Sequence, residues 1–334
     1  MLQQDFPGFS DLDDIIEQLS NSGAEQRGAI FTRPEVVDFI LDLVGYTRTK
    51  KLHTKSILEP SFGSGEFLIE VVRRLLASYK RYRSGGYDFL RDLGGAVRAV
   101  ELHKDSFEEV RSRILEQLTE FGVPTIQARR LVDEWLMCGD YLLKEIEKRF
   151  EFIVGNPPYV RQELIPNPLL AEYRRRYKTI FDRADLYVPF YERSLGLLAK
   201  SGKLGFICSD RWTKNRYGEP LRKLIASEFC IESYIDMVDT DAFLSEVTTY
   251  PAITIISRKK PRPVRIIQRP SIERTVLNAV VKDLRTDKTS AAPLRPQPRE
   301  NGPEQPIRRC DVWSLPLPPI SGELMAQGGD FQLQ

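Results

Sequence analysis

The tetrad Asn156-Pro157-Pro158-Tyr159 contains the residue types that chemistry on an exocyclic amine, such as that of adenine, requires. Such an amine is a poor nucleophile because its lone pair is delocalised into the ring, and two hydrogen-bond acceptors would make its nitrogen more tetrahedral. The Asn156 side-chain oxygen and the Pro157 carbonyl are two such acceptors, and the consecutive prolines hold the backbone stiff. Tyr159 offers a flat face on which a base removed from a duplex can stack. Taken alone, the tetrad could also be an inert proline turn that follows a strand.

A glycine-containing segment, residues 59–67, follows a short apolar run and precedes a helical pattern. Gly63 and Gly65 allow a sharp turn and let a ligand approach the backbone near Ser61. The segment does not match a phosphate-binding loop, because no Gly-Lys-Ser/Thr follows, no GxGxxG spacing is present, and its glutamates would repel phosphate. An acidic residue ahead of the turn, Glu59, instead suits a cation such as the methionine amino group of S-adenosylmethionine.

Two further carboxylates follow expected strands. Glu101 ends the second strand, where it could accept hydrogen bonds from both ribose hydroxyls of a ligand or simply be a surface residue. Asp140 follows the third strand and could accept from the adenine amine of the cofactor or cap a helix over residues 141–149. Glu59, Glu101 and Asp140 therefore stand in order at the ends of three successive strands, which predicts one S-adenosylmethionine site.

The elements that must position these residues alternate between short apolar runs and helical patterns from residue 34 to residue 258. This alternation predicts an α/β fold with a doubly wound, mostly parallel seven-stranded sheet and helices on both faces. The expected helices include residues 66–82, 104–120, 185–199 and 218–229. The seven expected strands are residues 56–58, 96–102, 136–138, 152–154, 203–208, 231–237 and 252–257.

Composition is that of an ordinary soluble globular protein, with 41% hydrophobic and 29% charged residues. No apolar run reaches membrane-spanning length and the N-terminus lacks the order of a signal peptide, so we expect a cytoplasmic protein with no membrane partner. Four widely spaced cysteines and two histidines argue against a metal or a Cys/His nucleophile. Buried, reduced thiols are the favoured interpretation.

Basic residues gather in three groups, although the net charge is only +2. Such groups are usually solvated faces, but two of them flank the candidate active-site segments, where they could contact phosphates. The third group runs from Arg258 to Arg269. The candidate DNA-binding residues are Arg174, Arg175, Arg176, Lys178, Lys214 and Arg216.

With these motifs in this order, residues 27–260 resemble the amino (gamma-type) class of adenine-specific DNA methyltransferases of restriction–modification systems. Residues 28–39 are similar to the N-terminal cofactor motif of that class, in which Thr32 would touch the methionine part. Residues 202–207 are similar to its fifth-strand motif. The resemblance assigns Phe243 to a second stacking position on the target base, with Tyr250 as a rival and a buried core position as the plain alternative.

The resemblance implies the class I S-adenosylmethionine-dependent methyltransferase fold, double-stranded DNA as partner, and methyl transfer to N6 of a flipped-out adenine. Direct transfer without a covalent enzyme intermediate is expected, because no cysteine lies near the Pro-Pro turn in the sequence. Two alternatives stay open: methylation of a protein glutamine amide or of guanine in ribosomal RNA, and a non-catalytic cofactor-fold module of a DNA-binding assembly.

Three regions are expected along the chain. Residues 1–26 form an N-terminal helical extension, and residues 27–260 form the methyltransferase catalytic domain. Residues 261–334 are a Pro-rich linker or the start of a C-terminal DNA-recognition region, since 11 of the 22 prolines fall between Pro261 and Pro319. The class usually carries a recognition domain after the catalytic domain, so a separate recognition domain or subunit is an expected partner.

Overall fold

The computed structural model of the chain describes residues 9–21, 30–83, 85–244, 250–260 and 262–285. In this part of the chain, eight strands form one sheet in the order β3-β2-β1-β4-β5-β7-β6-β8. The five strands from β3 to β5 are parallel, β7 is antiparallel to both of its neighbours, and β8 is parallel to β6. The strands are β1 Ile57–Glu59, β2 Val97–Glu101, β3 Leu136–Cys138, β4 Phe150–Gly155, β5 Leu198–Ser209, β6 Cys230–Asp236, β7 Pro251–Ser257 and β8 Arg265–Gln268.

The α/β fold and all seven expected strands are confirmed, but the number of strands is wrong by one. The additional strand, β8, has four residues that alternate between half-buried and exposed positions. A pattern of this length at the edge of a sheet is too short to be distinguished from a loop. It pairs with β6 through Tyr234, which lies opposite Ile266.

Eleven α-helices lie in the described residues, and two of the expected ones have the predicted bounds. The possible helix after Asp140 is absent, since residues 141–144 form only turns. The proline at position 34 begins a helix, as expected from its preference for the first turn. The helices are α1 Phe9–Ser20, α2 Pro34–Val44, α3 Glu66–Tyr82, α4 Phe89–Leu93, α5 Lys104–Glu120, α6 Thr125–Trp135, α7 Asn167–Arg176, α8 Tyr187–Gly196, α9 Arg211–Lys214, α10 Glu219–Glu228 and α11 Arg274–Arg285.

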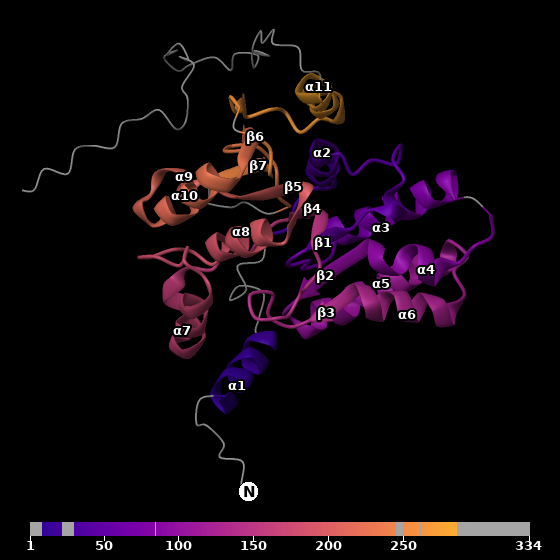
Figure 1. Cartoon of the computed structure of the whole chain (residues 1–334), viewed down its shortest axis with the longest axis horizontal. Helices are drawn as coiled ribbons and strands as arrows, with labels where there is room; N and C mark the ends of the chain where they lie inside the picture. The colour runs from indigo at the N-terminus through magenta and orange to yellow at the C-terminus, as the bar shows by residue number, and fades with distance from the viewer. Residues whose placement is uncertain (1–8, 22–29, 84, 245–249, 261, 286–334) are drawn as a thin grey trace, which may run out of the picture. The chain divides into compact units, whose positions relative to one another are not determined.

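Helices cover both faces of the sheet, as Figure 1 shows. Successive residues of a strand point to opposite faces, so β4 sends Phe152 and Val154 to one hydrophobic cluster and Ile153 to the other. The first cluster includes residues of α2, α3, α5, α6 and α11, and the second includes residues of α7, α8 and α10. This two-sided burial explains why the central strands read as continuous apolar runs in the sequence.

The order of the strands reverses between β1 and β4, because the chain moves outward from β1 to β3 and then returns to the other side of β1. At such a point the loops at the carboxyl ends of neighbouring strands separate and leave a crevice, which is where ligands bind in open α/β sheets. The loops after β1 and β4 carry the glycine-containing segment and the Asn-Pro-Pro-Tyr tetrad. The topology therefore brings the two candidate motifs to one edge of the sheet.

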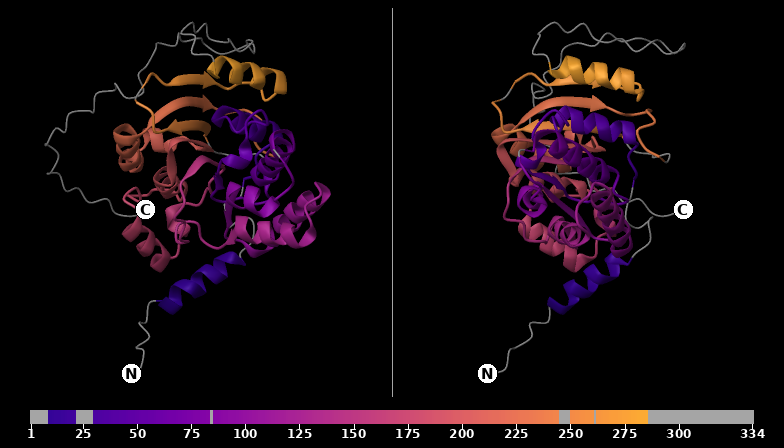
Figure 2. Two further views of the ribbon diagram at one scale, coloured as in Figure 1. Left: turned by 45° about the vertical axis from the view of Figure 1, so that its right-hand side comes forward. Right: turned by 90° about the vertical axis from the view of Figure 1, so that its right-hand side faces the viewer.

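Residues 265–285, which belong to the region expected to follow the catalytic domain, add β8 and α11 to the structure, and Figure 2 shows both at the same end of the sheet. Leu277, Val280, Val281 and Leu284 of α11 are buried in the first hydrophobic cluster. The remainder of that region, residues 286–334, lies outside the described residues.

Arg74 of α3 forms ion pairs with residues of α2 and of its own helix. Its side chain is only 6% exposed, and the guanidinium group pairs with Asp38 at 2.7 Å, Asp42 at 2.9 Å and Glu70 at 2.8 Å. Asp38 also lies 3.5 Å from Arg274 of α11. A buried charge with this many partners holds the three helices in one relative arrangement.

Neither a membrane-spanning helix nor a metal-binding cluster occurs among the described residues. No helix among them combines the length and the apolarity that crossing a bilayer requires. No group of three or more His, Cys, Asp or Glu side chains in the same residues could hold a metal ion. Cys208 and Cys230 are buried free thiols and Cys138 is a half-buried one, whereas Cys310 lies outside the described residues.

Candidate active site

A cavity of about 270 Å³, here called the strand-end cavity, opens at the carboxyl ends of β1 to β4. It brings together eight of the residues that the sequence singled out, and these come from five separate segments. These are Thr32, Glu59, Ser61, Gly63, Glu101, Asp140, Asn156 and Pro158. Side chains of α7 and α8, among them Leu169, Tyr173 and Phe190, close its other side. The expectation that the three carboxylates face one site agrees with this lining.

The glycine-containing loop needs its glycines at two positions. Gly65 has a φ of +86° at the N-cap of α3, and a Cβ there would lie 3.0 Å from both methyl carbons of Val110. Gly63 has a φ of +52°, with open space where a Cβ would point. Both values lie in the left-handed region that other residues rarely adopt. The loop therefore turns sharply into α3 and leaves its backbone open to the cavity.

Glu101 holds that loop in place. Its Oε2 accepts a hydrogen bond from the Gly63 backbone N–H at 2.7 Å, and its Oε1 accepts one from the His103 N–H at 2.9 Å. The residue is only 3% exposed, although it lines the cavity. Glu101 therefore fixes the loop that follows β1 at the edge of the cavity.

Glu59 presents a different environment. It is 3% exposed, and its Oε2 has no hydrogen-bond partner among the described residues. Burial raises the pKa of Glu59 well above its usual value, and the nearby carboxylates of Glu66 and Glu101 raise it further. A buried carboxylate in this setting favours a cationic partner, because a nearby positive charge would stabilise the ionised form and offset the effect of burial on the pKa.

Asp140 is fixed by two contacts. Its Oδ1 accepts from the Leu142 N–H at 2.7 Å, and its Oδ2 accepts from the hydroxyl of Tyr173 on α7. Burial raises the pKa of Asp140, and the two hydrogen bonds oppose that change. The residue thus links the end of β3 to α7 across the cavity.

Asn156 follows β4, and the orientation of its amide is determined by its neighbours. Nδ2 donates to the Ile30 carbonyl at 2.7 Å and to Thr32 Oγ1 at 3.3 Å. Because the Ile30 carbonyl can only accept, the nitrogen must face it and the oxygen must face the other way. Asn156 Oδ1 is buried and has no partner among the described residues. A buried acceptor left open in this way is costly and requires an explanation.

The segment that carries Thr32 is held against the chain before β7. Thr32 forms an isolated antiparallel bridge with Phe243, and the flanking backbone hydrogen bonds join Arg33 to Ala242 and Leu244 to Phe31. Phe243 itself is 7% exposed and belongs to the first hydrophobic cluster. Phe243 does not line the strand-end cavity. The rival residue, Tyr250, is 51% exposed. The stacking role of Phe243 stays a prediction.

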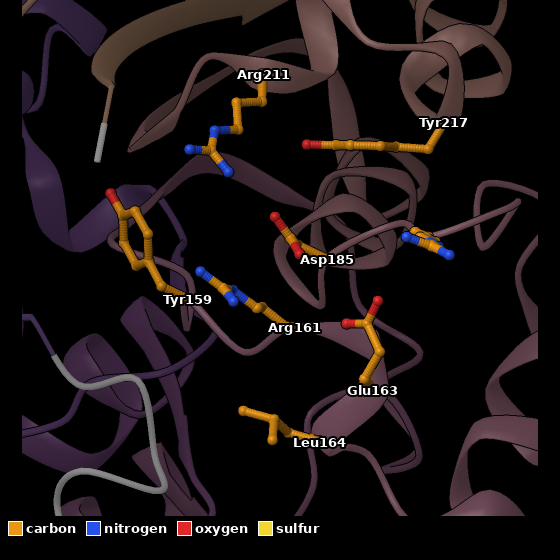
Figure 3. Close-up of a pocket in the computed structure, with 8 residues that line it drawn as sticks. Tyr159, Arg161, Glu163, Leu164, Asp185, Arg211 and Tyr217 are labelled. Carbon is orange, nitrogen blue, oxygen red and sulfur yellow. The ribbon is translucent and has the colours of Figure 1, made fainter. Parts of the chain in front are cut away.

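Tyr159 lines a second, more open cavity of about 540 Å³, here called the arginine cavity (Figure 3). The tetrad thus spans both spaces, with Asn156 and Pro158 on the strand-end cavity and Tyr159 on the arginine cavity, while Leu164 lines both. The Tyr159 hydroxyl is buried without a partner among the described residues, and burial raises its pKa well above the usual value. The arginine cavity is lined by Tyr159, Arg161, Glu163, Leu164, Arg183, Asp185, Arg211 and Tyr217.

Three of the residues on the arginine cavity, Arg161, Asp185 and Tyr217, did not stand out in the sequence. Arg161 lies two residues after the tetrad, outside every basic group. Asp185 begins the expected helix before β5, and Tyr217 is an uncharged residue within the second basic group, which runs from Arg211 to Lys223. Only the fold brings these separate segments to one cavity. The proximity of Arg161 to Tyr159 in the sequence was the one available signal.

Two of the predicted DNA-binding arginines on α7 form ion pairs with a carboxylate of the same helix. Glu172 pairs with Arg175 at 2.7 Å and with Arg176 at 2.6 Å, and these contacts lower the pKa of Glu172 to about 2. Lys214 pairs with Asp210 at 2.6 Å. Arg174, Lys178 and Arg216 are exposed or half-buried at the surface. Whether any of these six residues contacts DNA stays a prediction.

The third basic group stabilises the sheet instead. The buried carboxylate of Glu232 pairs with Lys203 at 2.8 Å, Lys259 at 2.9 Å and Arg262 at 2.9 Å. Burial alone would oppose ionisation, but these cations lower the pKa of Glu232 to about 2. The same cluster joins β5 and β6 to the chain after β7.

A cysteine does lie near the tetrad in space, although none is near it in sequence. Cys208 of β5 is 1% exposed, and its thiol lies 3.3 Å from the Tyr191 hydroxyl. Burial raises the pKa of Cys208 to about 12. Because the thiolate is the nucleophilic form, this thiol is inert at neutral pH.

Comparison with solved structures defines the class of fold. A protein from Listeria monocytogenes that is assigned to the class I S-adenosylmethionine-dependent methyltransferases matches with a TM-score of 0.54 and 14% identity, over 83% of this chain and 77% of that one. The methyltransferase subunit of a type I restriction-modification system from Streptococcus thermophilus matches with a TM-score of 0.55 and 16% identity, over 81% and 56%. The chain has the class I S-adenosylmethionine-dependent methyltransferase fold.

The family is narrower than the fold. The sequence profile described as Eco57I restriction-modification methylase matches residues 70–243, more than half of the chain, and the protein belongs to this family. Type II methyltransferase M.PaeR7I of Pseudomonas aeruginosa is 53% identical over 92% of this chain and 52% of its own length. Type II methyltransferase M.XhoI of Xanthomonas vasicola is 51% identical over 77% of this chain and 48% of its own length. The chain spans about half the length of these relatives.

The fold and the family imply S-adenosylmethionine as the cofactor, and the strand-end cavity fits it. The unpartnered carboxylate of Glu59 suits a positively charged group. Glu101 lies at the end of β2, where carboxylates of this kind of sheet bind ribose hydroxyls. Gly63 lines the cavity without a side chain and has open space where a Cβ would point. The assignment of individual residues to this cofactor stays a prediction; the candidates are Thr32, Glu59, Ser61, Gly63, Gly65, Glu101, Asp140 and Pro157.

Proposed function

We propose that the protein transfers a methyl group from S-adenosylmethionine to N6 of an adenine flipped out of double-stranded DNA, as part of a restriction–modification or phage-defence system. One observation carries this proposal: Asn156 Oδ1 is a buried, unpartnered acceptor whose direction is set by the two acceptors behind it. Membership of the restriction-modification methylase family supports the same conclusion.

The mechanism follows from the tetrad. Asn156 Oδ1 and the Pro157 carbonyl accept the two hydrogens of the adenine amine, which makes the nitrogen more tetrahedral and a better nucleophile. The anchor of Nδ2 on Ile30 and Thr32 keeps the acceptor in position without reorganisation during the reaction. When bound, S-adenosylmethionine would supply an electrophilic methyl group for direct transfer, with the S–C bond broken, the uncharged thioether as leaving group, and one amine proton lost to water. No covalent enzyme adduct with DNA forms, since Cys208 is buried and protonated.

The cofactor residues act before the chemical step. Glu59 would neutralise the cationic methionine part, and Glu101 would accept from the ribose hydroxyls while holding Gly63. Asp140 would accept from the cofactor adenine. Thr32 would contact the methionine part while accepting from Asn156 Nδ2, so one side chain connects the cofactor to the acceptor of the target amine.

The base-binding side is supported by the position of Tyr159. Its ring lies on the arginine cavity, and its centroid is 6.4 Å from that of Tyr187 at an interplanar angle of 49°. A flipped base would stack on the Tyr159 ring while its amine reaches Asn156. Recognition of the DNA sequence involves a further domain or subunit, in agreement with the greater length of the relatives.

One experiment tests the proposal. The protein is incubated with radiolabelled S-adenosylmethionine and, separately, with duplex DNA, RNA and a protein extract, and the labelled product is hydrolysed and identified. We expect label in N6-methyladenine from DNA, and none from the Asn156→Ala variant under the same conditions. Label in a glutamine amide or in ribosomal RNA guanine would replace the proposal by its alternative. Absence of label from every acceptor, with the cofactor bound, would favour a non-catalytic module.

A further inference from the structure

The arginine cavity contains cations that the proposed reaction does not yet use. Its lining draws on four separate segments: the chain after the tetrad, the chain before α8, the start of α9, and the turn before α10. Figure 3 shows the guanidinium groups of Arg161 and Arg211 directed into the same space as the Tyr159 ring. The cavity is therefore continuous with the proposed base-stacking surface.

Ion pairing distinguishes these arginines from several other basic residues of the described chain. No ion pair within 4.0 Å joins Arg161, Arg183 or Arg211 to a carboxylate in the described residues. By contrast, Arg175, Arg176, Lys214, Arg262 and Arg269 each pair with a carboxylate at 2.6 to 2.9 Å. An arginine that is already paired must lose that partner before it can bind a phosphate, whereas these three carry no such cost.

The acidic residues on the cavity limit where an anion can sit. Asp185 is half-buried and Glu163 is exposed, so the lining carries three positive and two negative groups. Burial raises the pKa of Asp185, and Arg211 and Arg161 oppose that change, so its carboxylate lies within the electrostatic reach of both arginines. Figure 3 shows Asp185 between Arg161 and Tyr217, on the side of the cavity away from Tyr159.

The floor of the cavity is aromatic and fixed. The Tyr217 hydroxyl lies 2.9 Å from the Tyr187 hydroxyl, and the Tyr187 ring packs beside that of Tyr159. Arg211 also lies over the ring of Tyr250, 5.5 Å from its centroid. These contacts give a rigid wall that carries guanidinium groups at its rim, which is the arrangement of surfaces that bind single nucleotides by stacking and by phosphate contact.

We propose that the arginine cavity holds the sugar-phosphate of the target strand beside the flipped adenine, with Arg161 and Arg211 binding its phosphates and Arg183 supporting them at the rim. This inference rests on the proposed function, because it places the base on Tyr159. A base stacked there has its sugar and phosphates in the adjoining space, since they are joined to it by a single glycosidic bond. The arginines are DNA-positioning residues and do not touch the reacting atoms.

The test measures the affinity of the full chain for a short fluorescein-labelled single-stranded oligonucleotide that contains adenine, over a range of salt concentrations. A single strand avoids the energy of base flipping and needs no recognition sequence. Each phosphate contact contributes about 0.7 to the slope of log K against log salt for single strands. We therefore expect Arg161→Ala and Arg211→Ala each to reduce the slope by about 0.7 and the double variant by about 1.4.

The matched control is Arg91→Ala on α4, which removes an exposed arginine that pairs with Asp92 at 2.9 Å and is outside the lining of both cavities. The control should leave the slope unchanged, and all variants should keep the cofactor affinity and the melting temperature. In methyl transfer, the two cavity variants should raise the KM for DNA and leave kcat nearly unchanged, which a general structural defect would not do.

The failures are distinguishable. If the wild type methylates DNA adenine and the cavity variants keep its slope and KM, the phosphate role is wrong and the proposed function stands. A wild type that binds no oligonucleotide would also overturn the phosphate role. If the wild type methylates no DNA but the cavity variants still show a smaller slope of log K against log salt, the cavity binds phosphate. In that case the proposed function is the part that fails.

Discussion

Replacement of Asn156 by alanine tests the central step of the proposed reaction. The change removes Oδ1, the acceptor for one hydrogen of the target amine, and also the donor that satisfies the Ile30 carbonyl at 2.7 Å. Loss of one preorganised hydrogen bond to the transition state costs about 100- to 1,000-fold in kcat, or about 3 to 4 kcal/mol. The Ile30 carbonyl, left without its hydrogen-bond donor, separately lowers the free energy of unfolding by about 1 to 3 kcal/mol.

Two measurements separate these effects: single-turnover methyl transfer and calorimetric titration with S-adenosylmethionine. We expect the transfer rate of Asn156→Ala to fall by at least the factor above while its cofactor affinity stays close to that of the wild type. The graded comparison is Thr32→Val, which removes the weaker partner of Nδ2 at 3.3 Å, leaves Ile30 in place, and also removes the hydroxyl proposed to contact the methionine part, an effect that the cofactor titration reports separately. A loss of about 1 kcal/mol, or about fivefold in rate, is expected from that change.

Any of three results would refute the reasoning. Equal losses of cofactor affinity and of transfer rate in Asn156→Ala would make the residue structural. An unchanged rate in Asn156→Ala would mean that the unpartnered Oδ1 has no role in the chemistry. A larger loss of rate in Thr32→Val than in Asn156→Ala would place the important contact on Thr32 itself.

Three further predictions concern the same molecule. Tyr159→Phe should keep methyl transfer and raise the free energy of unfolding by about 1 to 3 kcal/mol in urea titrations, because it removes a buried hydroxyl without a partner. Tyr159→Ala should lose activity. A destabilised Tyr159→Phe would show that the hydroxyl is needed. Burial and neighbouring carboxylates raise the pKa of Glu59, so a cationic cofactor should bind more tightly as the pH rises through that pKa and should release a proton on binding. Titration calorimetry in two buffers of different ionisation enthalpy measures that proton, and Glu59→Gln should abolish both effects; a wild type that releases none would contradict the assignment. Arg74→Met should lower the free energy of unfolding by about 3 to 5 kcal/mol, since it leaves three carboxylates without their shared cation; a change too small to measure in urea would mean that the pairs contribute little.

The sequence predicts the fold well where its periodicities are long or wholly apolar. The helices α3 and α5 have their predicted bounds, and the central strands are recognisable because both of their faces are buried. The edge strand β8 is not recognisable, since half of its four residues are exposed and its pairing depends on β6. The helix considered after Asp140 does not form, because that side chain accepts from the Leu142 N–H in a local turn and from Tyr173.

The site is predictable only as far as each motif is local. The three carboxylates could be recognised because each directly follows a strand, and parallel strands place their carboxyl ends together. The contact between Asn156 and Ile30 spans 126 residues and leaves no local signal. Arg161, Asp185 and Tyr217 are brought together by the packing of three loops, and the residue types alone do not indicate a shared cavity. Phe243 illustrates the opposite case, a residue suggested by its motif that is buried in the core.

The two backbone hydrogen bonds accepted by Glu101 have a thermodynamic consequence for ligand binding. They join the loop after β1 to the end of β2 within the protein itself, so the loop is ordered without any ligand. The conformational entropy of that ordering is lost when the chain folds, and the ligand does not have to compensate for it. A ligand that contacts this loop therefore meets a backbone that is already in place.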